Sequence, residues 1–474
     1  MNDNRHKIDH LDEQIMTLLN ERFKIVKEIG RMKLEQGLPI ANRERELVVL
    51  SKANSYLYDQ EIKMVYETLF QESRHLQTFA YGLIGKHLPY TDSPTLYQAM
   101  GLNQYQVMET NDFQKTIHKI PYLGLNVTIP YKEEAYRYCK EHDVSSELTG
   151  VVNTIVGEKG YNTDYLAAKH LFQAKNIHPN KVIIIGNGAT SRSMAQAITG
   201  EVVFLVRNIR KVNDCLLTDY RKHLDAEMII NTTPYGTYPE VKNEPLFPLN
   251  EFKQLKWVMD VVYHPIFTPL IRSAIKQQCS IITGYELLVH QAVRSMQLMT
   301  GKVIDPALLF QSRIPEMMNI VLIGMPFSGK SHCAKRLSTR YNREFIDMDI
   351  VLSERHQDLK TVLKTGTEAD YRQFEVELAE ELKDVRGKII STGGGLVLSS
   401  KAMEALSPNG LIVFLNPPLE TLISRIDDNR PLVASPQNLE TLYHQRYSLY
   451  QSYADLVVSE EDGVINNIYE VLHH

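Results

Sequence analysis

The sequence has few cysteines, no long hydrophobic run and no excess of positive charge. Its four cysteines among 474 residues are isolated and form no Cys-x-x-Cys pair, so we expect reduced thiols in a cytoplasmic protein. No run of about 18 apolar residues is present that would span a bilayer, and the start MNDNRHKIDHLDEQ is too polar for a signal peptide. The net charge of −5 provides no basic field for nucleic acid. We therefore expect neither nucleic-acid nor membrane partners.

The length and the changes of pattern along the chain predict three domains. A chain of 474 residues is long enough for about three domains of ordinary size. The expected blocks are an all-α helical dimerising domain, a two-lobed α/β domain and an α/β P-loop domain, at 1–78, 79–313 and 318–474. Within the middle block we expect a substrate lobe, a nucleotide-binding Rossmann lobe and C-terminal helices, at 79–178, 179–283 and 284–313.

Residues 1–78 have the spacing of amphipathic helices. Apolar residues recur at intervals of three and four until Gly37 and Pro39 end the pattern. At 1.5 Å per residue, this first helix would be roughly 50 Å long. Two shorter helices are expected near 42–53 and 59–77. Because three helices with one so long cannot enclose a core alone, the block predicts a homodimer through these helices.

The middle block alternates short β-rich runs with helical stretches, which is typical of a parallel, doubly wound sheet. The run VIIIGNGAT predicts a strand, a glycine turn and a helix, with Ala189 in place of the third glycine of a dinucleotide fingerprint. After the next strand, Arg207 and Asn208 stand where an acidic residue would indicate NAD. A cation there suits a 2′-phosphate, so the sequence favours NADP(H). A Rossmann-like fold without a dinucleotide remains open on this motif alone.

Lys132 and Asp164 are the candidate chemical groups of the middle block. Lys132 lies in the turn-rich segment NVTIPYKEEA, and Asp164 begins a helix in GYNTDYLA. Taken alone, a solvated lysine and a helix N-cap are the simpler interpretation. If the two converged beside a nicotinamide, the ammonium would supply a proton to a carbonyl oxygen as hydride adds to the carbon, and the carboxylate would orient the lysine.

The third block contains a nucleotide-binding motif. The stretch GMPFSGKS fits G-x-x-x-x-G-K-[ST] between an apolar run and a helical pattern. Its backbone N–H groups are expected to bind phosphate oxygens, with Lys330 near the β- and γ-phosphates and Ser331 on Mg²⁺. After the next strand come Asp347 and Asp349, of which one can help to hold Mg²⁺ while the other binds a sugar-like hydroxyl. These features favour a small-molecule kinase that uses ATP.

The third block resembles shikimate kinase over essentially its whole length. The matching pieces are GMPFSGKS, FIDMD, EADYRQFE, STGGGLV, RPL and QRYSLY. The resemblance implies phosphorylation of the 3-hydroxyl of shikimate, with magnesium near Ser331 and Asp347. It implies that the nucleotide contacts Gly324, Ser328, Gly329, Lys330, Ser331 and Arg430. Shikimate would contact Asp349, Arg372, Gly394, Gly395 and Arg446.

Residues 79–305 resemble shikimate dehydrogenase. The matching pieces include GKHLPYTDSPTLYQA, NVTIPYK, GYNTD, INTTPYG, DVVYHPIFTPLI and GYELLVHQA. The resemblance implies that Lys132 and Asp164 are the catalytic pair, and that NADP contacts Gly186, Gly188, Ala189, Ser191, Arg192, Arg207 and Asn208. The substrate would contact Thr91, Ser93, Thr128, Asn153, Tyr263 and Gln291. Because Thr91 replaces a usual serine and Tyr165 a usual glycine, quinate stays open as a competing substrate.

Residues 1–78 resemble the all-helical chorismate mutases, in which two chains intertwine and each site takes one arginine from the partner. The matching pattern is RHKIDHLDEQIMTLLNERFKIVKEIGRMK, NRERE and ESRHLQ. The implied rearrangement of chorismate to prephenate needs a pinned conformer and donors to developing charge. Arg5 matches the partner's arginine, and Lys33 and Gln77 match the donors to the ether oxygen. The remaining implied contacts are Arg22, Arg43, Glu44 and Ser73.

Together the sequence predicts a cytoplasmic, homodimeric enzyme of aromatic amino-acid biosynthesis. The activities, in chain order, are chorismate mutase, NADP-dependent shikimate dehydrogenase and shikimate kinase, and the dehydrogenase product is the kinase substrate. Three alternatives stay open. In the first alternative, the first block is a non-catalytic dimerisation or effector-sensing module. In the second, the dehydrogenase also uses quinate. In the third, the third block phosphorylates another small metabolite.

Overall fold

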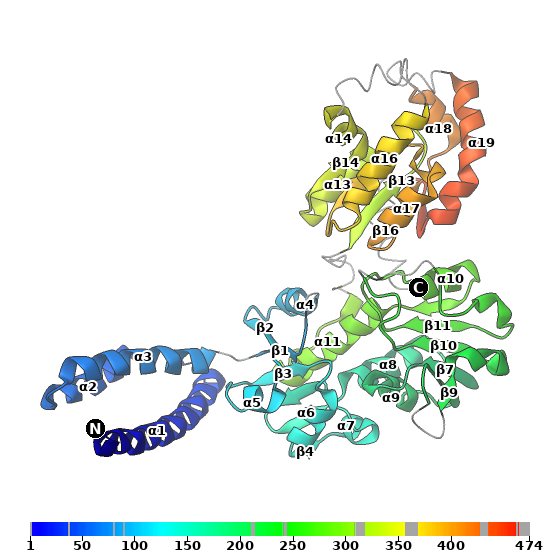
Figure 1. Ribbon diagram of the computed structural model, residues 1–474. Helices are drawn as coiled ribbons and strands as arrows, with labels where there is room; N and C mark the ends of the chain where they lie inside the picture. Colours follow the sequence, from blue (N-terminus) through cyan, green and yellow to red (C-terminus); the bar gives the residue numbers. More distant parts are fainter. Residues whose placement is uncertain are drawn as a thin grey trace. The chain divides into compact units, whose positions relative to one another are not determined.

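The computed structural model contains two compact units. It describes residues 2–36, 38–78, 81–88, 91–209, 214–238, 240, 244–307, 309, 318–355, 368–426, 435–460 and 463. The first unit comprises Met1–Leu166 and Ala292–Ile304, and the second comprises Ala167–Gln291 and Asp305–His474. The first contains the N-terminal helices and one sheet, and the second contains two sheets. Figure 1 labels most of the elements along the chain.

The N-terminal segment is helical, as the apolar spacing predicts. Its three α-helices are α1 (Asn2–Glu35), α2 (Arg43–Ser51) and α3 (Asp59–Thr78), with a short 3₁₀ turn between the last two. The 34-residue α1 packs against α3 (Figure 1). Several large apolar side chains of α1 remain more than half exposed, namely Ile8, Leu11, Ile15, Met16, Leu18, Ile25 and Met32. In a single chain, these helices therefore do not bury their own apolar faces.

The sheet of the first unit is mixed. Its order is β2-β1-β3-β5-β6-β4, from β1 (Tyr81–Gly85), β2 (Tyr105–Glu109), β3 (Gly124–Val127), β4 (Glu141–His142), β5 (Thr154–Val156) and β6 (Lys159–Tyr161). β1 is parallel to β2 and β3, but β5 is antiparallel to β3 and β6. The prediction of a parallel sheet is wrong for β5, because the two-residue turn at Gly157 folds β5 and β6 into a hairpin.

Helices α4 to α7 accompany this sheet and supply two of its functional segments. Their bounds are α4 (Ser93–Ala99), α5 (Phe113–Ile117), α6 (Lys132–Tyr138) and α7 (Val144–Thr149). The core contains Ile84, Leu125 and Ile155 of the strands together with Phe113 and Ile117 of α5. Candidate residues begin both α4 and α6, so the core positions these helix starts.

The second sheet is parallel and has the strand order of a Rossmann domain. The order is β12-β11-β10-β7-β8-β9, from β7 (Lys181–Ile185), β8 (Glu201–Val206), β9 (Asp214–Leu216), β10 (Met228–Asn231), β11 (Trp257–Asp260) and β12 (Ser280–Ile282). The accompanying helices are α8 (Thr163–Ala174), α9 (Ala189–Gln196), α10 (Pro269–Lys276) and α11 (Gly284–Thr300). The order reverses between β7 and β10, which is where such sheets bind ligands at the strand ends.

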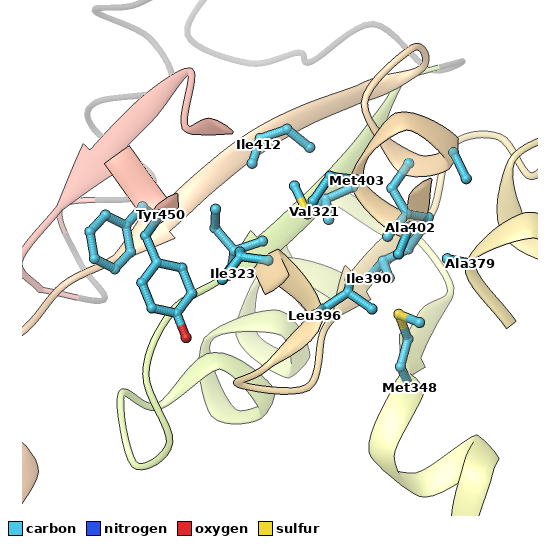
Figure 2. Packing of buried hydrophobic residues seen from close by; sticks show 14 of the residues in the cluster. Val321, Ile323, Met348, Ala379, Ile390, Leu396, Ala402, Met403, Ile412 and Tyr450 are labelled. Carbon is cyan, nitrogen blue, oxygen red and sulfur yellow. The ribbon is translucent and has the colours of Figure 1, made fainter. Parts of the chain in front are cut away.

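The third sheet is also parallel, with order β14-β15-β13-β16-β17. The strands are β13 (Asn319–Ile323), β14 (Phe345–Asp347), β15 (Ile389–Ser391), β16 (Gly410–Leu415) and β17 (Leu456–Val458). The helices are α13 (Lys330–Tyr341), α14 (Met348–Arg355), α16 (Glu368–Leu382), α17 (Ser400–Leu406), α18 (Leu419–Ser424) and α19 (Pro436–Tyr453). Figure 2 shows Val321, Ile390 and Ile412 packed with Met403 and Tyr450. These strands are buried on both faces, which is typical of a parallel sheet covered by helices.

No helix within the described residues combines the length and apolarity that a membrane span requires.

Candidate active sites

Lys132 and Asp164 form a buried ion pair. The Lys132 Nζ donates to Asp164 Oδ2 at 2.6 Å, and each side chain is 11% exposed. Lys132 begins α6, which follows β3, and Asp164 lies in the first turn of α8, which follows β6. Asn162 caps α8 by accepting from the Tyr165 N–H, so Asp164 is not needed as the cap. The interpretation of the two residues as a solvated lysine and an N-cap is therefore wrong.

Other predicted substrate residues lie at the same edge of the first sheet. Thr128 follows β3, and Asn153 precedes β5, which is antiparallel to β3 and so starts at that edge. The Asn153 Oδ1 accepts from the Thr163 N–H at 2.7 Å and from the Thr163 hydroxyl at 3.0 Å. Near the start of α4, Thr91 Oγ1 accepts from the Ser93 N–H at 3.3 Å. Tyr263 and Gln291 belong to the second unit, where each is partly exposed.

Asn126 is a buried polar residue that the sequence reasoning missed. Its amide nitrogen donates to Ser295 Oγ at 2.6 Å and to Thr154 Oγ1 at 3.1 Å, and its oxygen accepts from the Tyr105 hydroxyl at 2.8 Å. Asn153 contacts the same network through Thr154. An asparagine within the apolar strand GLNV was the available signal, because a buried amide requires partners from other elements.

Four of the predicted dinucleotide residues line a cavity of about 660 Å³ at the carboxyl ends of β7, β8 and β10. Gly186, Gly188, Arg207 and Asn208 line it. Gly186 has φ of +100°, and a Cβ there would lie 2.9 Å from Thr232 Oγ1, so this position requires glycine. The exposed backbone and the adjoining arginine fit a phosphate-bearing dinucleotide.

Three predicted cofactor residues lie in the first turn of α9 and are not among those that line this cavity, namely Ala189, Ser191 and Arg192. Ser191 instead supports the glycine turn. Its buried hydroxyl accepts from the Gly188 N–H at 3.0 Å and shares a 2.7 Å hydrogen bond with Thr232. Sequence reasoning missed Asp214, which lines the cavity and accepts from the Asn187 amide.

The GMPFSGKS motif forms the loop between β13 and helix α13, as predicted. The Lys330 Nζ lies inside the loop and donates to the carbonyl oxygens of Gly324 at 3.0 Å and Met325 at 2.9 Å, and to Ser328 Oγ at 3.4 Å. Gly329 and Gly324 have positive φ of +92° and +152°. An ammonium within a ring of backbone groups ahead of a helix fits a phosphate.

The two candidate magnesium residues are Ser331, at the start of α13, and Asp347, at the end of β14. Ser331 Oγ is 3.4 Å from Ser391 Oγ, and Ser391 is the β15 register partner of Asp347. Asp347 and Ser391 are both buried. A hydroxyl and a carboxylate together suit Mg²⁺, which prefers oxygen ligands. The sequence reasoning did not include Ser391, whose signal was its place at the end of the run KIIS.

The predicted shikimate residues of the third block converge. A Cβ at Gly395 would lie 1.9 Å from the Arg372 guanidinium, and Arg446 donates to the Gly394 carbonyl at 3.1 Å. A Cβ at Gly393 would lie 2.9 Å from Asp349 Oδ1. The glycine run thus provides the space in which two arginines and one aspartate meet. Arg430 lies outside the described residues.

Three residues that the sequence reasoning missed support this group. Glu375 is 1% exposed and pairs with Arg372. Burial raises the pKa of Glu375, while the Arg372 charge acts in the opposite direction. The Tyr371 hydroxyl donates to Asp349 at 3.0 Å, and the Tyr450 hydroxyl donates to the Gly394 carbonyl. Their spacing gave no signal, because the contacts join α14, α16, α19 and the loop after β15.

In the helical segment, the structure brings three predicted residues together between α1 and α3. The Arg22 guanidinium donates to Ser73 Oγ at 2.7 Å, and the Gln77 amide donates to the Ser73 carbonyl at 3.1 Å. The Gln77 Oε1 is buried without a hydrogen-bond partner within the described residues. This buried oxygen is thus available to a polar partner.

Lys33 lies near this group on α1, because a Cβ at Gly30, one turn before it, would be 2.8 Å from the Gln77 side chain. Lys33 donates to the Ile40 carbonyl at 2.6 Å, and Arg43 and Glu44 are exposed at the start of α2. Arg5 is exposed on α1, 17 residues before Arg22. At 1.5 Å per residue this separation is roughly 25 Å, so Arg5 does not reach the Arg22 group of its own chain.

Comparisons with known proteins identify all three blocks. Family models match chorismate mutase type II at residues 4–78, the substrate binding domain of shikimate dehydrogenase at 83–155, and shikimate kinase at 326–473. The chain is 32% identical to shikimate dehydrogenase (NADP(+)) of Methanococcus maripaludis over 259 residues, which are 48% of this chain and 93% of that protein. It is 31% identical to that of Saccharolobus islandicus, covering 49% and 93%.

Solved structures are also similar to this chain. A chorismate mutase/shikimate 5-dehydrogenase fusion protein from Clostridium acetobutylicum has 25% identity and a TM-score of 0.44, covering 48% of this chain and 92% of that one. Shikimate dehydrogenase 1 from Peptoclostridium difficile has 26% identity and a TM-score of 0.42, covering 49% and 94%.

A glycine turn in a Rossmann lobe, a buried Lys–Asp pair and a P-loop domain define an enzyme with oxidoreductase and kinase parts. The chain belongs to the shikimate dehydrogenase family. With the domains that flank the dehydrogenase, it is a multifunctional shikimate-pathway enzyme with chorismate mutase, NADP-dependent shikimate dehydrogenase and shikimate kinase domains. The sequence-based prediction of these three families is confirmed.

Proposed function

We propose that Lys132 and Asp164 carry out the proton transfer in the reduction of 3-dehydroshikimate to shikimate. Their buried 2.6 Å ion pair is the observation that carries this proposal. NADPH supplies the hydride when bound. Lys132 Nζ donates a proton to the carbonyl oxygen, and Asp164 holds the ammonium in place and accepts from a neighbouring hydroxyl. Asn153, Thr128 and Ser93 bind the ring hydroxyls and the carboxylate.

The kinase block transfers the γ-phosphoryl group of ATP to the 3-hydroxyl of shikimate. Lys330 neutralises phosphate charge, and Ser331 and Asp347 hold Mg²⁺, whose charge stabilises the transferring group. Arg372 and Arg446 bind the shikimate carboxylate, and Asp349 accepts from a ring hydroxyl. The convergence of these side chains on the glycine run supports this assignment. No covalent chemistry by the protein is required, because positioning and charge neutralisation lower the barrier.

The helical block rearranges chorismate to prephenate as a homodimer in the cytoplasm. The exposed apolar side chains of α1 and the distance of Arg5 from Arg22 support a second copy that covers α1 and supplies its Arg5. Arg22 and Arg43 bind carboxylates, and Lys33 and Gln77 donate to the ether oxygen. The proposed domain limits remain 1–78, 79–313 and 318–474.

The purified full-length chain tests the three activities directly. NADPH absorbance follows reduction of 3-dehydroshikimate, a coupled ADP assay follows shikimate phosphorylation, and ultraviolet absorbance follows loss of chorismate. We expect all three conversions. Chorismate binding without turnover would identify the helical block as an effector sensor, and absence of shikimate phosphorylation would assign the kinase to another metabolite.

Quinate is the second candidate for the dehydrogenase. The Thr91 hydroxyl accepts a backbone hydrogen bond and carries a methyl group where the family usually has serine, so its contact with substrate differs. Oxidation rates of shikimate and quinate with NADP⁺, measured at the same enzyme concentration, decide the preference. We expect shikimate to be preferred, and comparable kcat/KM values would establish a dual-substrate enzyme.

A further inference from the structure

Asp260 is a fully buried carboxylate at the end of β11 and is not one of the predicted ligand residues. Its oxygens accept three hydrogen bonds, from the Asn231 amide at 2.9 Å, the Val262 N–H at 3.0 Å and the Thr268 hydroxyl at 2.6 Å. Thr268 also caps helix α10 by accepting from the Ile271 N–H. The carboxylate thus ties the ends of β10 and β11 to the start of α10.

Asn231 connects this carboxylate to the loop after β10. It is the register partner of Asp260 on the neighbouring strand and is 2% exposed. Its Oδ1 accepts from the Thr233 N–H at 3.1 Å and from the Thr233 hydroxyl at 2.7 Å, and its Nδ2 also donates to the Tyr235 carbonyl at 3.3 Å. The Asn231 side chain therefore determines the shape of the loop 232–236.

The loop 232–236 forms one wall of the dinucleotide cavity. On one side it presses against the glycine turn, because a Cβ at Gly186 would lie within 3.0 Å of both Thr232 and Thr233. On the other side a Cβ at Gly236 would lie 3.6 Å from the Thr268 Cβ. The width of the cavity between the glycine turn and this wall depends on the hydrogen bonds of Asn231 and Asp260.

We propose that the Asn231–Asp260 pair positions the 232–236 wall for NADP(H). The hydrogen-bond donors and acceptors of the pair then determine the affinity for the cofactor and not the rate of the chemical step. Both are positioning residues, since their side chains face the loop and the helix start and not the cavity. This inference rests on the NADP-dependent dehydrogenase activity proposed above. A purely structural role would lower stability without a selective change in cofactor binding.

Isosteric substitutions separate these two roles. Asn231→Asp keeps the size but sets a second carboxylate against Asp260 and against the Tyr235 carbonyl. We expect KM and Kd for NADPH to rise about tenfold or more, as expected for unmatched buried polar groups, while kcat at saturating NADPH stays within about twofold. Asp260→Asn alone changes little, because its oxygen still accepts from Asn231 and Val262 while its amide donates to the Thr268 hydroxyl.

The double variant Asn231→Asp/Asp260→Asn restores a donor–acceptor pair between the two strands, but the Tyr235 carbonyl still faces a carboxylate, so the variant should recover part of the cofactor affinity lost in Asn231→Asp. The matched control is Asn180→Asp, because Asn180 donates to Glu227 at 3.1 Å at the opposite edge of the same sheet. It introduces the same carboxylate–carboxylate contact away from the cavity, so KM for NADPH should stay unchanged.

Fluorescence titration with NADPH gives Kd without turnover. A wild-type protein that does not reduce 3-dehydroshikimate would therefore contradict the proposed function, while the Kd measurements would still test this inference. An unchanged Kd for Asn231→Asp, or an equal rise for Asn180→Asp, would overturn the inference. Should Asn231→Asp fail to fold, Thr268→Val decides. It removes one Asp260 hydrogen bond together with the α10 cap while keeping the side-chain shape, and thermal unfolding measures the accompanying loss of stability. A threefold rise in Kd supports the inference, and no change contradicts it.

Discussion

Lys132 and Asp164 illustrate why a buried charge pair is informative about function. Removing an ammonium and a carboxylate from water has a desolvation cost that their attraction repays only with good geometry. The pair lies at a strand edge shared with Asn153 and Thr128, where polar partners for a ring acid are available. Apolar residues in place of a buried ion pair often give equal stability. The presence of the pair among polar partners therefore favours a chemical role.

Lys132→Ala should abolish reduction of 3-dehydroshikimate and leave shikimate phosphorylation at the wild-type rate. Loss of the proton donor should reduce the dehydrogenase kcat about 10²- to 10⁴-fold. NADPH oxidation and ADP release measured on the same preparation check both parts. Lys140→Ala is the control, because Lys140 pairs with Glu158 on the exposed surface. Retained reduction in Lys132→Ala would remove this lysine from the mechanism.

Single residues could be assigned from sequence where they belong to a local motif. Lys330, Ser331, Gly186 and Lys132 were identified in this way, and each lies in the expected turn or helix start. Glu375 could not be assigned, because its role depends on Arg372 and on the glycine run of another segment. Polar residues that act on other protein side chains have no fixed spacing from the motifs they serve.

At the level of elements, Glu286 joins the first turn of α11 to the end of α8. It is 3% exposed and pairs with Lys175 at 3.2 Å. Burial raises its pKa from 4.5 to about 7, while the Lys175 charge acts in the opposite direction. Between pH 4.5 and about 7, Glu286 binds more protons in the folded protein than in the unfolded chain. The contribution of Glu286 to the free energy of unfolding is therefore lost as the pH rises through this range.

Glu286→Gln removes this titration and should change stability in a pH-dependent way. The free energy of unfolding of the variant relative to the wild type should increase from pH 5 to pH 8, by at most about 3 kcal/mol. Thermal unfolding at both pH values measures the trend. Glu158→Gln, on the exposed Lys140 pair, is the control. A difference that stays constant with pH would contradict the pKa of Glu286 inferred from burial.

The elements also show where local patterns fail to predict sheet topology. Helix α1 and the strands of the two parallel sheets follow their apolar periods. Strand β5 does not follow the parallel arrangement, since the short turn at Gly157 pairs it with β6 as a hairpin. The side-chain period of a strand is the same in both directions, so its direction is set by its connections and not by its period.

For the whole molecule, the exposed apolar face of α1 supports the proposed homodimer. In a dimer with shared mutase sites, Arg5→Ala and Arg22→Ala should each abolish chorismate rearrangement. Mixed chains should regain about a quarter of the wild-type activity, because half of the dimers are heterodimers and each has one complete site. Chorismate loss after co-expression measures this recovery.

Differently tagged Arg5→Ala chains, mixed with each other, are the control and should remain inactive. Purified heterodimers of Arg5→Ala and Arg22→Ala without activity would argue against a shared site. Dehydrogenase and kinase activities should be unchanged in all of these variants, since both residues lie on α1.

The sequence by itself determined the three families, the NADP preference and the P-loop, because each is encoded in a contiguous motif whose backbone folds locally. Only the tertiary structure decided which of the other polar side chains meet, such as Asn231 with Asp260 and the cavity wall. These residues are separated by about 30 positions and become neighbours through strand order. Their contacts therefore depend on the packed sheet, which no local pattern specifies.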